Sequence, residues 1–188
     1  MQDSDEELIV EYLKGNQQAF KALVERYTAH LYNFSRRFVG ATAAPDIVQE
    51  TFIKVWKNIR KFDTSRAHFK TWMFTIARNT VIDYMRKKKI AVFSDLNKNE
   101  DESFSESLPD NVILPDEALQ KLEDRKFLNK LLDQIPPMYR EVLILYYQEE
   151  MTFSEIGEML DKPLNTVKSH HRRALKQLKK MTLNNQTQ

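Results

Sequence analysis

The chain has 188 residues, enough for one domain or two small ones, and its 41% hydrophobic and 30% charged residues are typical of a soluble globular protein. It has no cysteine, which excludes disulfides, thiolate metal sites and thiol catalysis. The 3 glycines, 6 prolines and scarce alternating apolar pattern predict an all-α fold. With no apolar run of ~18 residues and no charged-then-apolar leader, we expect a cytoplasmic protein without membrane insertion.

The net charge of +2 is distributed unevenly along the chain. Residues 163–181 contain six Lys or Arg and no acid, whereas residues 90–115 contain six acids and one Lys. This segregation predicts a polyanionic partner for the basic segments.

The first 89 residues have the signals of four helices. Ser4 and Glu7 form a capping-box pattern. Gly40 ends the second helix, and Pro45 suits the first turn of the third. The expected helical ranges are 4–14, 17–39, 45–60 and 69–89.

The third of these helices has an apolar and a polar face. The residues expected to face inward are Val48, Phe52, Val55, Trp56 and Ile59. Those expected to face outward are Asp46, Gln49, Glu50, Lys54 and Lys57.

The stretch 46–89 interleaves aromatic and basic residues more densely than any other part of the chain. On the helix 69–89 the expected core stripe is Phe69, Met73, Ile76, Thr80 and Tyr84. The opposite side is expected to present Thr71, Thr75, Arg78, Ile82, Arg86 and Lys89, with Asn79 at its edge. Cations follow phosphates and planar side chains stack on unpaired bases, so the pattern suits an opened DNA strand. An ordinary buried helix with a solvated basic back is the alternative.

The segment 90–115 is acidic, contains Ser and Asn, and ends in Pro109 and Pro115, which is typical of a flexible linker. We therefore expect a helical domain at 1–89, a linker at 90–115 and a second helical domain at 116–188.

The second domain has the pattern of a helix-turn-helix. Helical periodicity returns over Asp116–Gln134, and Pro136 and Pro137 precede a helix to about residue 149. Thr152 and Glu155 form a capping-box pattern that opens a helix 153–160. After a turn at 161–163, the last helix is expected to start with Asn165 as its N-cap and to run to about residue 181.

The last helix is strongly basic on one side. The expected inward stripe is Val167, His171, Ala174, Leu175 and Leu178. Facing outward or at its flanks are Lys168, Ser169, Arg172, Arg173, Lys176, Lys179 and Lys180. Those near the helix start would contact base edges, and the later lysines would contact phosphates. The alternatives for such a helix are a membrane surface or plain solvation.

No active site is predicted. Asp46 and Glu50 are one helical turn apart, a spacing typical of a solvated face rather than of acid–base catalysis. His170 and His171 point about 100° apart on a helix and cannot readily share a metal. The chain has no glycine-rich phosphate loop and no zinc-type spacing, so we expect neither a cofactor nor a metal, and no enzyme.

Two motifs resemble bacterial sigma factors. Asp46-Ile-Val-Gln-Glu-Thr-Phe-Ile-Lys-Val-Trp56 and Phe69-Lys-Thr-Trp-Met-Phe-Thr-Ile-Ala-Arg-Asn79, with Asp83 and Arg86 beyond, resemble region 2 of that family. Glu155-Ile-Gly, Pro163-Leu-Asn-Thr-Val-Lys-Ser169 and Arg173-Ala174 resemble region 4. Both motifs occur in order on a short chain, which is similar to the extracytoplasmic-function (ECF) group with just these two domains.

The resemblance implies a promoter-specificity subunit that binds core RNA polymerase, recognises −10 and −35 elements and assists DNA melting. It implies that the polymerase clamp coiled coil, in the largest subunit, is bound by Asp46, Gln49, Glu50 and Lys54. The −10 element would be bound by Phe62, Asp63, Arg66, His68, Lys70, Arg78, Asn79 and Arg86, within or after the loop 62–68. The −35 element would be bound by Asn165, Lys168, Ser169, Arg172, Arg173 and Lys176.

The resemblance also implies the flap of the second-largest polymerase subunit as a partner, a linker in the RNA exit path, and an anti-sigma factor. Three residues depart from the family pattern: Asn165 replaces a usual Gly, His171 a usual aliphatic residue, and His170 a common Arg that affects the −35 preference. The rival functions are a free-standing helix-turn-helix regulator, an RNA-binding subunit and an enzyme.

Overall fold

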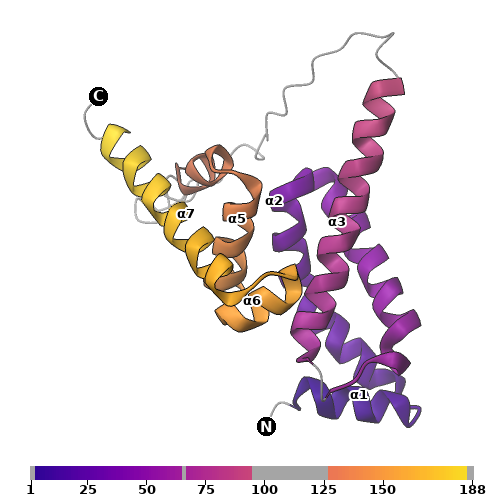
Figure 1. Ribbon diagram of the computed structural model, residues 1–188. Helices are drawn as coiled ribbons and strands as arrows, with labels where there is room; N and C mark the ends of the chain where they lie inside the picture. Colours follow the sequence, from indigo (N-terminus) through magenta and orange to yellow (C-terminus); the bar gives the residue numbers. More distant parts are fainter. Residues whose placement is uncertain (1–2, 65–66, 95–126, 186–188) are drawn as a thin grey trace, which may run out of the picture. The chain divides into compact units, whose positions relative to one another are not determined.

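The computed structural model describes residues 3–64, 67–94 and 127–185, and within these ranges the chain forms helices and no strand (Figure 1). The described helices divide into two compact units. One contains α1, α2, η1 and α3 together with residues 154–162, and the other contains the helical residues 127–134 with α5, η2 and α7. None of the described helices is long and apolar enough to span a bilayer.

The first helix, α1 (Asp5–Leu13), begins with the predicted capping box. The Ser4 backbone N–H donates to the Glu7 carboxylate at 2.7 Å, and the Glu7 N–H donates to the Ser4 hydroxyl at 3.2 Å. Gly15 ends the helix in a left-handed conformation, φ +105°, which glycine adopts without strain.

The next helix, α2 (Gln17–Asn58), is kinked at Gly40, where φ is +82° and ψ is 170°. Our expected end at Gly40 is therefore confirmed as a break in helical geometry. The expected start of a third helix at Pro45 is wrong, because the helix resumes directly after Gly40. Pro45 therefore lies inside α2, in the second turn after the kink.

The N-terminal unit packs α2 against both α1 and α3. After the short helix η1 (Ile59–Lys61), α3 (Phe69–Ser94) runs five residues beyond its expected end at Lys89. The large fully buried side chains of this unit are Leu23, Leu31, Phe34, Ile47, Ile59, Phe69, Met73 and Phe74.

The C-terminal unit has its core where α5 (Pro137–Leu143) packs against α7 (Leu164–Asn185). This core contains Leu132, Ile135, Leu143 and Ala174, with Tyr139, Leu178 and Met181 packed beside them. A π-helical turn, η2 (Ile144–Gln148), follows α5 directly. The expected helix to residue 149 is thus present, with its last turn widened.

The helix-turn-helix elements are present at the expected places in the chain. α6 (Phe153–Leu160) has the predicted bounds, and a turn with Asp161 at φ +51° leads to α7. The expected N-cap is wrong: α7 begins at Leu164, and the Pro163 carbonyl accepts from the N–H of Thr166 at 2.8 Å. Asn165 therefore lies inside the first turn. The acidic segment from residue 95, and residues 116–126 of the helix expected next, lie outside the described residues.

Candidate nucleic-acid interface

The second half of α2 exposes the polar face that its sequence predicts. Asp46, Gln49 and Glu50 are exposed, while Val48 and Val55 are buried. Lys54 is half-buried, because its ammonium donates to the Thr80 hydroxyl of α3 at 3.0 Å and pairs with Glu50 at 2.8 Å. Lys54 thus joins α2 to α3 at the edge of this face.

Trp56 is the main residue of this face that the sequence pattern misplaced. It was expected inside, but 53% of it is exposed, as is 43% of Ile53. The reason is angular: Thr51 and Val55 define the buried stripe, and Trp56 lies 100° further round the helix. At spacings of 4 and 3, Gln49, Ile53 and Trp56 share one side. The polar face therefore includes two exposed apolar side chains, Ile53 and Trp56. Phe52, also expected inside, is half-buried.

The exposed side of α3 combines polar, apolar and basic groups. Asn79, Ile82 and Arg86 are exposed, and Arg78 is half-buried beside them. Arg86 donates to Asp83 one turn back at 2.9 Å. Thr71 was expected on this side but is buried, because the buried arc of α3 is wide enough to include Phe74 and Val81 as well. The half-buried Ile76 and Tyr84 lie at the margin of that core stripe.

Aromatic rings pack around the segment that joins η1 to α3. The ring of Phe62 lies 5.0 Å from that of Trp72 and 5.7 Å from that of Phe69, measured between centroids. Asp63 and His68 are exposed and Lys70 is half-buried. Arg66 lies outside the described residues. The described −10 candidates thus cluster around the first turn of α3 and along its exposed side.

Nearly all −35 candidates lie on the exposed side of α7. Ser169 is half-buried, and its hydroxyl donates to the Thr166 carbonyl at 2.9 Å. The exposed candidates are Asn165, Lys168, Arg172, Arg173 and Lys176, and Lys179 and Lys180 continue the basic surface.

Of the two histidines of α7, His170 is the more deeply buried, although only His171 was expected in the inward stripe. His170 is only 8% exposed and its ring lies edge-on to Tyr139, with centroids 5.3 Å apart. The buried stripe is Val167, His170 and Ala174, at spacings of 3 and 4, so Leu175 is 40% exposed rather than inward. The substitution at His170 therefore does not place an altered side chain on the basic face.

His171 lies at the edge of the buried stripe, within a group of aromatic rings. Its Nε2 is 3.2 Å from the Tyr147 hydroxyl, and its ring contacts Tyr146, Tyr147 and Phe153. Burial lowers the pKa of His171, which favours the neutral imidazole. As expected, His171 has a packing role.

Among the described residues no group of three or more His, Cys, Asp or Glu could hold a metal ion. The described surfaces comprise a polar face on α2 that includes Ile53 and Trp56, a mixed basic face on α3 and a strongly basic face on α7.

Comparison with known proteins gives matches to both halves of the chain. The family model for Sigma-70 region 2 matches residues 23–90, and that for Sigma-70, region 4 matches residues 131–180. The ECF RNA polymerase sigma factor SigW of Bacillus subtilis (strain 168) is 37% identical over 171 residues, covering 89% of this chain and 90% of the relative. The chain belongs to the ECF sigma factors.

Other relatives of this ECF sigma factor also match over most of their length. The ECF RNA polymerase sigma-E factor of Escherichia coli (strain K12) is 30% identical over 179 residues, with 91% and 90% coverage. The solved structure of CnrH in complex with the cytosolic domain of CnrY has a TM-score of 0.69, 25% identity and 96% and 97% coverage. The sigma factor RpoE of Bartonella quintana, in complex with the anti-sigma factor NepR, shares the fold with a TM-score of 0.66, at 22% identity and 87% and 96% coverage.

The region matches include the surfaces described above. In this sigma factor the region 2 match contains the second half of α2 and most of α3, and the region 4 match contains α6 and most of α7. Sigma factors are transcription initiation factors. The predicted resemblance and the all-α fold are therefore confirmed.

Proposed function

We propose that this sigma factor binds core RNA polymerase, directs it to promoters through −10 and −35 elements, and assists the opening of the DNA. The observation that carries the proposal is that both region matches contain exposed faces of the required chemistry, on α2 and α3 in one and on α7 in the other. The chain works in the cytoplasm and catalyses no reaction of its own.

Core polymerase binds the exposed face of the second half of α2. Asp46, Gln49 and Glu50 form a polar rim beside the apolar pair Ile53 and Trp56. An exposed tryptophan within a polar surface is typical of a binding hot spot. Trp56 therefore joins the polymerase-binding residues, and Lys54, held by Thr80, sets the edge of the face.

The exposed side of α3 and the adjoining segment bind the opened −10 strand. Asn79 and Arg86 supply hydrogen bonds and positive charge, and Ile82 offers an apolar contact. Phe62 and Trp72 supply ring faces next to His68. Unpaired bases stack on such rings, while paired bases cannot reach them.

The exposed side of α7 binds the −35 element as duplex DNA. Arg172 and Arg173 lie about two turns from the start of the helix, with Lys168 before them and Lys176 after them. Arg and Lys pair with guanine edges in the major groove and with phosphates along it.

An anti-sigma factor binds the same sigma factor and masks its polymerase-binding surface. The relative RpoE is seen in complex with the anti-sigma factor NepR, and CnrH with the cytosolic domain of CnrY. The exposed Trp56 and Ile53 give such a partner an apolar surface to cover.

Run-off transcription with bacterial core polymerase tests the function. With this chain added, we expect a discrete set of new start sites on a library of host promoter fragments. Gln49→Lys or Glu50→Lys is expected to abolish them, while Lys21→Gln, a charge change at the exposed Lys21–Glu25 pair in the first half of α2, leaves them intact. Fragment binding without initiation, unaffected by these variants, identifies a free-standing regulator instead, and preference for structured RNA identifies an RNA-binding subunit.

A further inference from the structure

The ammonium of Lys54 connects the exposed face of α2 to a buried group of α3. It donates to the Thr80 hydroxyl at 3.0 Å and lies 2.8 Å from a carboxylate oxygen of Glu50, one turn back in α2. Thr80 is only 1% exposed, whereas the Glu50 side chain is 51% exposed. Lys54 therefore holds a surface carboxylate with one hydrogen bond and a buried hydroxyl with another.

The Thr80 hydroxyl is oriented to accept a hydrogen bond from Lys54. Its single hydrogen is donated to the Ile76 carbonyl one turn back in α3, at 2.9 Å. The oxygen lone pairs remain to accept, and an ammonium can only donate. Because Thr80 is buried and its hydroxyl is fixed by the helix backbone, it gives Lys54 an anchor that solvent does not displace.

This anchor changes what the Glu50–Lys54 ion pair can do. An exposed ion pair usually contributes little, because two long side chains must lose rotamer freedom to form it. Lys54 is already restrained by Thr80, so less freedom remains to be lost when Glu50 pairs with it. The Glu50 carboxylate is thereby held within the exposed face that it shares with Asp46 and Gln49.

We propose that Lys54 is a positioning residue of the polymerase-binding face and that Thr80 is its anchor. Lys54 orders the Glu50 carboxylate before core polymerase binds, so less conformational entropy is lost on association. Affinity for core polymerase then depends on a hydroxyl of α3 that is buried and does not itself contact the polymerase. The proposal rests on the proposed function of Glu50.

The first test changes the anchor and leaves every charge in place. Titration of the fluorescently labelled full chain with bacterial core polymerase measures the affinity. Thr80→Val keeps the shape of the side chain but loses the hydroxyl, and is expected to weaken binding about threefold to fivefold. Thr80→Ser retains the hydroxyl and is expected to stay within about twofold of wild type.

The second test asks whether Lys54 acts through Glu50. Lys54→Met keeps the aliphatic stem and loses the ammonium, and is expected to weaken binding about fivefold to tenfold. In a chain that already has Glu50→Ala, the same change is expected to weaken binding less than about twofold, because the carboxylate that it positions is gone. A lysine that contacts polymerase directly would lose the same factor in both chains. Both positions are on the surface of α2, so this test does not depend on a change in the core.

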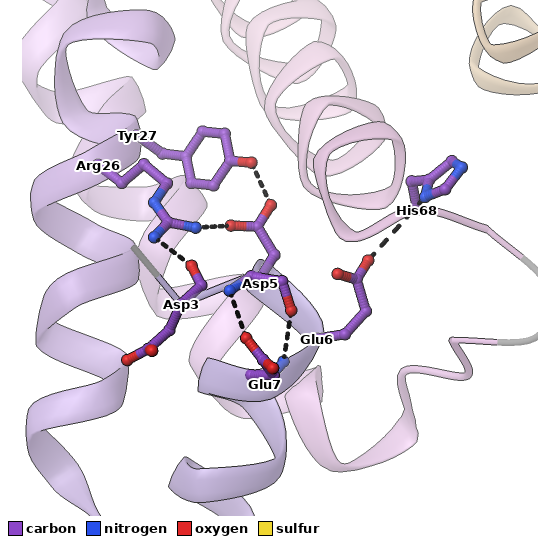
Figure 2. A network of polar contacts seen from close by, with 8 residues as sticks. Asp3, Asp5, Glu6, Glu7, Arg26, Tyr27 and His68 are labelled. Atoms are coloured by element: carbon purple, nitrogen blue, oxygen red, sulfur yellow. Dashed lines mark hydrogen bonds and ion pairs between the residues drawn. The ribbon is translucent and has the colours of Figure 1, made fainter. Parts of the chain in front are cut away.

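The control breaks a different hydrogen bond between helices of the same unit. The Tyr27 hydroxyl of α2 donates to the Asp5 carboxylate of α1, whose other oxygen accepts from Arg26 (Figure 2). Tyr27→Phe loses this hydroxyl and keeps the buried ring. It is expected to leave affinity for core polymerase within about twofold of wild type, which separates the Lys54 contact from a general loosening of the unit.

Three results would overturn the positioning role while leaving the proposed function intact. One is an equal loss from Lys54→Met with and without the Glu50 carboxylate. Another is a Thr80→Val affinity equal to that of Thr80→Ser. The third is a loss from Thr80→Val that Tyr27→Phe matches, or that follows the folded fraction measured by circular dichroism. A wild-type chain that does not bind core polymerase would instead overturn the proposed function, and the positioning role with it.

Discussion

The helices α3 and α7 both present cations to solvent, but they differ in what lies between those cations. On α3, Asn79 and the apolar Ile82 separate the charges, and the aromatic rings of Phe62 and Trp72 lie at its first turn. On α7 the exposed side is a nearly continuous basic surface from Lys168 to Lys180. Rings and amides bind bases that have left the helix, whereas dense positive charge binds phosphates of a duplex. The two faces thus suit two states of DNA.

The largest effect that separates the two faces is expected from Arg172→Ala combined with Arg173→Ala. Each arginine contact to a base is worth about 1–3 kcal/mol, so the pair is expected to lower affinity for −35 duplex roughly 100-fold. Affinity for an unpaired −10 strand is expected to be unchanged. Fluorescence anisotropy of holoenzyme with the two probes measures both. Lys130→Ala, at an exposed cation outside α7, is the control. Equal losses of affinity for the two probes would contradict the assignment of duplex binding to α7 alone.

The reverse selectivity is expected from Asn79→Ala. Asn79 is exposed, so the fold is unaffected, and loss of its base contacts is expected to weaken −10 strand binding about tenfold. The −35 duplex affinity should stay the same. Gln18→Ala removes an exposed amide from the start of α2 and serves as the control. If Asn79→Ala behaves like Gln18→Ala on the unpaired strand, α3 does not read that strand through this residue.

The dependence of affinity on salt concentration is expected to distinguish the two faces by a smaller effect. Lys176 lies in the basic surface of α7, where a phosphate contact releases counterions. Lys176→Ala is expected to reduce the slope of log affinity against log salt by about 1 for −35 duplex, and not at all for the −10 strand. Titrations of holoenzyme with each probe at several salt concentrations give both slopes, and an unchanged duplex slope would rule out the phosphate contact.

The N-terminal unit is expected to lose stability in alkali through Tyr27. Burial, and then the hydrogen bond to Asp5, raises the pKa of Tyr27 above its ordinary value of about 10. The stability this contributes is complete below pH 10 and is lost as pH rises further, because the unfolded chain releases the proton first. Urea midpoints at pH 9 and 11 are expected to fall more for wild type than for Tyr27→Phe. An equal fall would remove Tyr27 as the cause.

The smallest effect is expected at acid pH, in the C-terminal unit. Burial lowers the pKa of His171 below about 6.5, so the neutral ring contributes stability above that pH. As pH falls below 6.5 the unfolded chain binds the proton first and this contribution is lost. His171→Leu is expected to lose less thermal stability between pH 7 and 5 than wild type. His30→Leu, an exposed histidine of α2, controls for the change in charge.

Most of the architecture could be predicted from the sequence because its local signals are strong. The capping box at Ser4, the break at Gly40 and the bounds of α6 follow from cap and turn chemistry alone. Pro45 misled the prediction, since proline favours a helix start but does not require one. The end of α3 at Ser94 could not be predicted, because the change in composition after Lys89 suggested a boundary that the backbone does not follow.

The site predictions were weakest where a large or unusual residue borders a buried stripe. Trp56 was placed inside because tryptophan is apolar, although the spacing of Thr51 and Val55 already puts it outside. His170 was left out of the expected buried stripe for the same reason, since the apolar Leu175 shifted that stripe by one residue. In each case the angular position of a residue around the helix axis predicted its burial better than its residue type did.

The kink at Gly40 has a consequence for chirality. A Cβ at this position would meet nothing within 4 Å, so a side chain is opposed there by the backbone alone. With φ +82° and ψ 170°, Gly40 has the mirror image of an ordinary extended backbone conformation. L-amino acids avoid this conformation, whereas D-amino acids favour it. In a chain made by chemical synthesis, D-alanine would fit the joint between the two halves of α2, whereas L-alanine would strain it. The angle at which the proposed polymerase-binding face leaves the first half of α2 is therefore set by one achiral residue.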